Sequence, residues 1–223
     1  MIGLAALAGW MLSAAEPPIG SLVDPSPGAV TLGDIEARNA PERVSARLAE
    51  CIARSHRRGA AEMLELPYDS REQSEALLRL LRSECLGQLG QHSLQLRTPR
   101  TSFAGRIAEG LLHGVDTEDA QRQLAGMTDE AADQAGLTGR NYVEYLSLCA
   151  IRRDPASVAV LLTTARNTPG EAAAARRIVP QFGPCIVSGH TFEFNVRALR
   201  AILAVGYYRA VTRLRAVPAI SAR

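Results

Sequence analysis

The feature that most constrains the fold is an internal repeat that contains all four cysteines. At an offset of 98 residues Cys51 aligns with Cys149, and at an offset of 100 Cys85 aligns with Cys185. The alignment also matches apolar positions in the same order, namely Val44 with Tyr142, Leu48 with Leu146, Leu64 with Leu162 and Ile107 with Leu203. Self-similarity on this scale predicts two tandem pseudo-repeats, at residues 39–113 and 141–215, packed as one domain.

The repeat also predicts how the cysteines pair. Four cysteines allow three pairings, and a duplicated unit that closes its own disulfide needs only one pairing rule. We therefore expect the disulfides Cys51–Cys85 and Cys149–Cys185, each of which would contribute about 3 to 4 kcal/mol by closing a loop of roughly 35 residues. The alternative is four reduced core cysteines, which requires a cytosolic protein. The sequence has no C-x-x-C pair, which argues against a thioredoxin-like or zinc-ribbon site.

Periodicity and start signals predict a mainly α fold, with about three to four helices in each unit. Apolar residues and the first cysteine recur at helical spacing, and aromatic residues supply only 4% of the chain, which disfavours a β-sandwich. Candidate N-caps are followed three residues later by Glu, or directly by Pro: Asn39 with Glu42, Asp69 with Glu72, Asn141 with Glu144, Thr168 with Glu171, and Asp154 before Pro155. A short polar alternation at 94–96 and again at 192–194 predicts one short β segment in each unit.

The segments outside the two units have distinct compositions. Residues 1–15 are apolar and end in small residues, which predicts a signal peptide, although a buried N-terminal helix is the alternative. Residues 16–38 are rich in Pro and Gly and predict a linker, residues 114–140 predict an acidic helical connector, and residues 216–223 form a tail. With the cysteines, these segments predict a periplasmic or secreted protein with no integral membrane span after signal cleavage.

The basic residues exclude several functions. All 25 are Arg, and a chain without Lys cannot supply the lysine of a P-loop, a pyridoxal Schiff base or a protein kinase. The formal net charge of +2 is far from that of a nucleic-acid-binding protein, so no nucleic-acid partner is expected. The absence of Lys is itself consistent with GC-rich codon usage.

Motifs that would identify an enzyme are absent from the sequence, among them H-E-x-x-H, G-x-S-x-G and G-x-G-x-x-G. His92 and His190 coincide in the repeat, but in paired antiparallel strands they would lie roughly 20 Å apart, so no metal site is predicted. Two Arg pairs in the second unit are possible anion contacts, or solvated helix ends: Arg152 with Arg153, and Arg176 with Arg177. No cofactor is predicted.

The second unit contains three distinctive stretches: Cys149-Ala-Ile-Arg-Arg-Asp-Pro, Gly-Pro-Cys185, and Ala198-Leu-Arg-Ala-Ile-Leu-Ala near the C-terminus. In these stretches it resembles a group of uncharacterised exported bacterial proteins that carry duplicated two-cysteine helical units. The first unit departs from the pattern, since Arg57-Arg58 takes the place of the Asp-Pro step. The resemblance implies export and a fold with paired cysteines, and it implies no activity.

These observations favour an exported, disulfide-stabilised helical binding or interaction module with a possible protein partner in the cell envelope. The alternatives are a hydrolase-like enzyme and a small-ligand carrier, each with its site between the two units. A continuous exposed apolar patch would favour the binding module, a cleft with His and acidic residues the enzyme, and a dry apolar cavity the carrier. The sequence leaves the oligomeric state open.

Overall fold

The computed structural model describes residues 32–88, 99–188 and 195–216, with only the backbone described for residues 32–41. Within these ranges the chain forms eleven α-helices, one 3-10 helix and no strand. The prediction of a mainly helical, single-domain protein is confirmed. The expected β segments at 94–96 and 192–194, and with them His92 and His190, lie outside the described residues.

The described helices fall into a first half of the chain, a connector and a second half. The first half contains α1 (Leu32–Ser55), α2 (Arg57–Leu64), α3 (Arg71–Leu81), α4 (Glu84–Gln88) and α5 (Arg100–Leu112). The connector contains α6 (Glu118–Leu124) and α7 (Asp129–Gln134). The second half contains α8 (Tyr142–Arg153), α9 (Pro155–Thr163), α10 (Pro169–Phe182), the 3-10 helix η1 (Gly183–Cys185) and α11 (Val196–Ala216).

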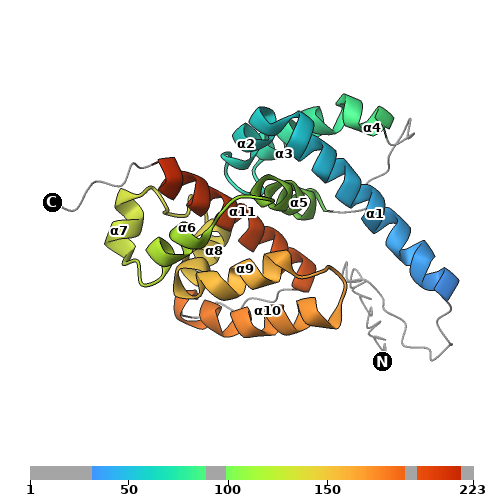
Figure 1. Cartoon of the computed structure of the whole chain (residues 1–223). Coiled ribbons are helices and arrows are strands. Elements are labelled where there is room, and N and C mark those ends of the chain that lie inside the picture. The colour runs from blue at the N-terminus through green and yellow to red at the C-terminus, as the bar shows by residue number, and fades with distance from the viewer. Residues whose placement is uncertain (1–31, 89–98, 189–194, 217–223) are drawn as a thin grey trace, which may run out of the picture.

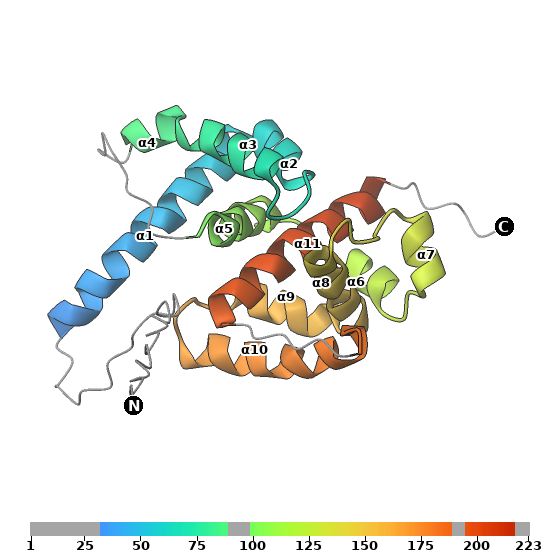
Figure 2. The same ribbon diagram turned by 180° about the vertical axis from the view of Figure 1, so that it is seen from behind.

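Helix α11 forms the centre of the core. Every residue from Leu199 to Val211 is buried, as expected for a helix that is covered on all sides. Figures 1 and 2 show α11 crossing the middle of the molecule, with α1–α5 on one side and α8–α10 on the other. It packs most extensively on α5, which in turn packs on α1, and on its other side it packs on α8.

Three close helix contacts require small side chains. A Cβ atom at Gly105 of α5 would lie 2.5 Å from the Cα atom of Ala201 in α11, so the two backbones nearly touch where these helices cross. A Cβ at Gly110 would lie 2.9 Å from the Cβ of Ala53 in α1. A Cβ at Gly206 of α11 would lie 2.6 Å from the Oγ of Ser147 in α8. These glycines therefore set how closely α5 and α11 approach their neighbours.

Each half is crosslinked by one disulfide, in the expected pairing. Cys51 of α1 bonds to Cys85 of α4, with their Cα atoms 5.7 Å apart. Cys149 of α8 bonds to Cys185 of η1, with their Cα atoms 6.0 Å apart. In both halves the bridge joins the first helix to the turn or short helix that follows the third, and both distances are typical of disulfides.

The N-cap predictions are correct in the second half of the chain. The side chains of Asn141, Asp154 and Thr168 accept hydrogen bonds from the backbone N–H groups three residues later, at 3.0, 2.9 and 3.2 Å. Each therefore satisfies one of the N–H groups that a helix leaves unpaired at its first turn.

Two start predictions in the first half are wrong. Helix α1 begins at Leu32, so Asn39 is an interior residue rather than a cap. Residues 34–40 contain neither Pro nor Gly, although the helix also includes Pro41, which cannot donate a backbone hydrogen bond. Helix α3 is capped by Ser70, which accepts from the Gln73 N–H at 3.1 Å, while Asp69 adopts a left-handed conformation with φ of 62°. The cap therefore lies one residue after Asp69.

Candidate binding groove

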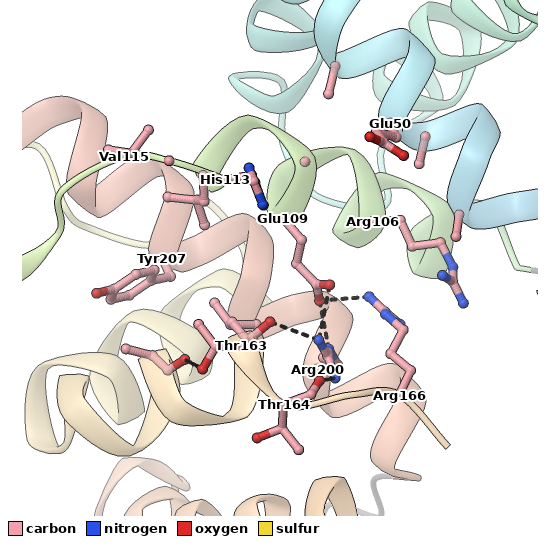
Figure 3. A pocket seen from close by; sticks show the side chains of 18 of the residues that line it. Glu50, Arg106, Glu109, His113, Val115, Thr163, Thr164, Arg166, Arg200 and Tyr207 are labelled. Atoms are coloured by element: carbon pink, nitrogen blue, oxygen red, sulfur yellow. Dashed lines mark hydrogen bonds and ion pairs between the residues drawn. The ribbon is translucent and has the colours of Figure 1, made fainter. Parts of the chain in front are cut away.

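A groove of about 1340 Å³ lies between the two halves of the molecule. Helices α1 and α5 contribute residues from the first half, while α9, the segment 164–168 and α11 contribute residues from the second. Figure 3 shows its interior, with His113 and Val115 near one end and Arg106 and Arg166 near the other. The groove is larger than the roughly 300 to 1000 Å³ that is usual for small-molecule pockets.

Helix α1 lines the groove with a single face. Three small residues, Ala46, Ala49 and Ala53, lie along it at helical spacing. Charged residues of α1 flank this alanine row, namely Glu42, Arg43, Glu50 and Arg54, and Arg57 at the start of α2 follows them. Across the groove, α9 contributes Ala159, Leu162 and Thr163. The α1 face of the groove therefore carries a row of small side chains with charged ones beside it, and α9 adds small and apolar side chains opposite.

The carboxylate of Glu109 lies between the two ends of the groove (Figure 3) and binds two arginines. It accepts a hydrogen bond from Arg166 Nη2 at 2.6 Å and two from Arg200, from Nε at 2.7 Å and from Nη2 at 3.2 Å. Figure 3 shows both guanidinium groups converging on it. Arg200 also donates to Glu171 at 2.9 Å and to the carbonyls of Leu162 and Thr164. The side chain of Arg200 is only 3% exposed, and its charge is compensated by two carboxylates.

Arg106 and Arg166 are less completely paired. Arg106 forms an ion pair with Glu42 through Nη2 alone, and Arg166 donates to Glu109 through Nη2 alone. Their side chains are 5% and 15% exposed. A guanidinium carries five N–H donors, so each group keeps donors that no described carboxylate or carbonyl accepts.

Burial disfavours the charged forms of Arg106 and Arg166. It lowers the pKa of Arg106 to about 10, to which the charge of Arg166 contributes and which the charge of Glu109 opposes. Burial likewise lowers the pKa of Arg166, where the charge of Glu109 opposes it and the charge of Arg200 adds to it. Two buried cations whose charged forms are disfavoured would gain from an additional anion.

Counted over the whole groove, the lining contains six arginines and three glutamates. The arginines are Arg43, Arg54, Arg57, Arg106, Arg166 and Arg200, and the glutamates are Glu42, Glu50 and Glu109. Arg43 and Arg57 are exposed and form no ion pair with a described residue. Even with the buried Glu171 beside Arg200 included, the groove carries a net positive charge.

A second cluster of buried charges, outside the lining of the groove, fixes the two halves to each other. The carboxylate of Glu144 in α8 accepts from the Tyr68 N–H at 2.6 Å, from Arg209 Nη1 at 2.6 Å, and from the N–H and side chain of Arg140. Arg209 and Arg140 also donate to backbone carbonyls in the segment 64–66. The segment that ends α2 is therefore held by charged groups of the second half.

The pKa of Glu144 follows from this arrangement. Burial alone would raise it, but the hydrogen bonds from Arg140, from the backbone N–H groups of Tyr68 and Arg140, and the charge of Arg209 outweigh burial. Together they lower the pKa of Glu144 to about 2. The charged carboxylate is thus strongly stabilised in the folded protein.

The four arginines predicted as possible anion contacts do not line the groove. Arg152 donates to Asp129 at 2.6 Å and to the Thr128 carbonyl at 3.1 Å, which ties α8 to α7. Arg153, Arg176 and Arg177 are exposed. The described residues also contain no group of three or more His, Cys, Asp or Glu side chains placed to hold a metal ion.

Sequence reasoning missed the residues that give the groove its charge. Glu109, Arg166 and Arg200 are far apart in the chain, so no local spacing links them. One signal was present in the last helix, where Arg200 and Arg209 interrupt an otherwise apolar sequence. A charge at a position that the helical pattern buries implies a buried partner, although the sequence does not say which one.

The comparisons with known proteins identify no relative: no family model matches the chain, and neither a curated protein nor a solved structure matches it. In the described part of the chain, no helix combines the length and the hydrophobicity that crossing a membrane requires.

Proposed function

We propose that the protein is an exported, disulfide-stabilised binding module that holds a segment of a protein partner in the groove between its two halves. The observation that carries the proposal is the groove itself, because both halves line it and its volume of about 1340 Å³ exceeds that of an ordinary small-molecule pocket. The two disulfides support a periplasmic or secreted location, since such bonds persist mainly in oxidising compartments.

The groove fits the alternatives less well. A hydrolase-like site would require a nucleophile next to a base, whereas Glu42 and Glu109 are engaged by arginines and His113 is the one histidine among the residues that line the groove. A small-ligand carrier would enclose a dry apolar cavity, whereas this groove is lined by six arginines.

The described residues do not form the continuous exposed apolar patch that would favour a binding module. Large exposed apolar side chains among the described residues are few, and they come from separate helices and a turn: Tyr145, Val160, Val179 and Val187. Scattered residues of this kind are normal on protein surfaces. We therefore place the partner in the groove rather than on an exposed apolar patch.

We also infer that the two halves arose by duplication of one unit, as in the exported two-cysteine proteins that the sequence resembles. Matched contacts support this inference, since Gly110 packs on Ala53 and Gly206 packs on Ile151. Gly206 corresponds to Gly110 at an offset of 96, and Ile151 corresponds to Ala53 at an offset of 98. Gly105 and Ala201, which contact each other, are themselves a matched pair at an offset of 96. Such a pairing is expected where two related units meet about a pseudo-two-fold axis.

The proposal is tested by co-purification from the cell envelope with a C-terminal tag and a variant that fills the groove. Ala46 is exposed in the middle of the α1 face, so Ala46→Trp would occupy the groove without entering the core. Ala131 is exposed on α7, outside the groove, and Ala131→Trp is the matched control. We expect a stoichiometric partner with the wild type and the control and its loss with Ala46→Trp. Equal recovery with both variants would refute the site.

A further inference from the structure

We infer that the partner segment is an amphipathic helix with acidic residues at both ends and a narrow face of small apolar residues between them. This inference rests on the proposed function and specifies the chemistry of the partner. It is carried by the length of the groove, the size of the residues in its middle, and the arginines with free donors at its ends.

The length of the groove matches a helical segment. Along α1 its lining runs from Glu42 to Arg54, and at 1.5 Å per residue this distance is about 18 Å. A helix of about 13 residues has the same length. The described residues offer no strand edge for an extended peptide to pair with, whereas helix-in-groove binding needs only complementary side chains.

The middle of the groove allows close approach of a helix. Ala46 of α1 is exposed to it, while Ala49 and Ala53 also line it but are only 2% exposed. With no large side chain along this row, a helix axis can approach α1 to the short end of the usual 8 to 10 Å range. Across the groove, Ala159 and Leu162 of α9 provide the second wall. A helix placed here would contact both halves of the protein through a narrow apolar stripe.

The ends of the groove favour carboxylates. Arg43, Arg106 and Arg166 lie at one end and Arg57 at the other, and each has guanidinium donors that no described group accepts. Arg43 and Arg57 are exposed at the rim, and Arg106 and Arg166 are buried deeper. The net positive charge of the lining complements acidic residues and repels basic ones.

The burial of Arg106 and Arg166 also supports this placement. Burial and neighbouring cations lower the pKa of Arg106 to about 10, and burial lowers that of Arg166. A carboxylate entering this end would offset both effects, since it favours the charged guanidinium.

The test uses three labelled 15-residue peptides with the same Ala/Leu stripe at helical spacing, flanked at both ends by Glu, by Gln or by Lys. Fluorescence anisotropy with the full chain should give a Kd about tenfold lower for the Glu peptide than for the Gln peptide, weakened by added salt, and no measurable binding of the Lys peptide. Arg43→Gln with Arg57→Gln should raise the Kd of the Glu peptide about fivefold. The matched control, Arg176→Gln with Arg177→Gln on α10, should leave it unchanged.

The outcomes separate this inference from the proposed function. Equal binding of the Glu and Gln peptides, or no binding of either, would overturn the inference, while loss of the co-purified partner in Ala46→Trp would still support the groove. Binding of the Glu peptide that Ala46→Trp does not weaken would place the site elsewhere and overturn both. A dimer in light scattering that Ala46→Trp dissociates would identify the occupant as a second copy of the chain and overturn the choice of a separate partner.

Discussion

Replacing Glu144 by Gln tests the charged cluster that holds the two halves together. The Glu144 side chain is 4% exposed, and its two oxygens accept five hydrogen bonds, from the backbone N–H of Tyr68 and Arg140 and from the Arg140 and Arg209 guanidinium groups. Gln keeps the shape but loses the charge and turns one acceptor into a donor. Arg209, which is 5% exposed, would then lack a counter-charge. Breaking a buried pair in this way costs about 3 to 5 kcal/mol.

The pH dependence supplies an independent estimate of the same quantity. The pKa of Glu144 is lowered from 4.5 to about 2 in the folded protein, so its contribution is complete above pH 4.5 and is lost as the pH falls toward 2. A shift of this size corresponds to about 3 kcal/mol, since one pKa unit is about 1.4 kcal/mol. The wild type should therefore lose about 3 kcal/mol more stability than Glu144→Gln between these pH values.

Urea denaturation at pH 7 and across this acidic range measures both numbers. Glu75→Gln is the matched control, because Glu75 pairs with Arg71 at 2.8 Å on an exposed surface and should change the free energy of unfolding by less than about 0.5 kcal/mol. If Glu144→Gln destabilises the protein by less than about 1 kcal/mol, or retains the acid dependence of the wild type, the reasoning about the buried cluster is refuted.

Three further changes have expected effects on the free energy of unfolding, each measured by denaturation. Replacing both cysteines of either disulfide by serine should cost about 3 to 4 kcal/mol, since the loops span 34 and 36 residues; non-reducing peptide mapping that links the two halves would contradict the pairing. Gly105→Ala should cost about 1 to 3 kcal/mol through its contact with Ala201, whereas Gly87→Ala, with no atom within 4 Å, should be neutral or slightly stabilising. Asp154→Ala should cost about 1 kcal/mol by removing the cap of α9, and an unchanged stability would argue against that cap.

Features of the fold that depend on local sequence were predictable. The caps at Asn141, Asp154 and Thr168 follow from short polar side chains directly before helical segments, and the disulfide pairing follows from the spacing of cysteines in a repeat. The start of α1 was missed because composition was averaged over residues 16–38, whereas the last residues of that segment favour a helix. Local patterns predict helices well, but averages over long segments hide where they begin.

The groove was not predictable, because it depends on tertiary contacts. Glu109 meets Arg200 from 91 residues away, and Arg106 meets Glu42 from 64 residues away. No periodicity specifies such pairs, and the choice of partner depends on how α5 crosses α11. The arginine pairs chosen from sequence are adjacent in the chain, and adjacent residues on a helix point about 100° apart. Proximity in sequence was therefore a poor guide to which arginines share a site.

The central claim is that the ligand binds between the two halves of the protein. Hydrogen exchange followed by mass spectrometry can locate the bound ligand. With the Glu-flanked peptide at saturation, backbone amides of residues 42–57 and 155–168 should exchange more slowly, while those of α7 at 129–134 should not change. Protection confined to these two segments would support the groove as the binding site. Protection of other surfaces, or of neither segment while the peptide is bound, would contradict it.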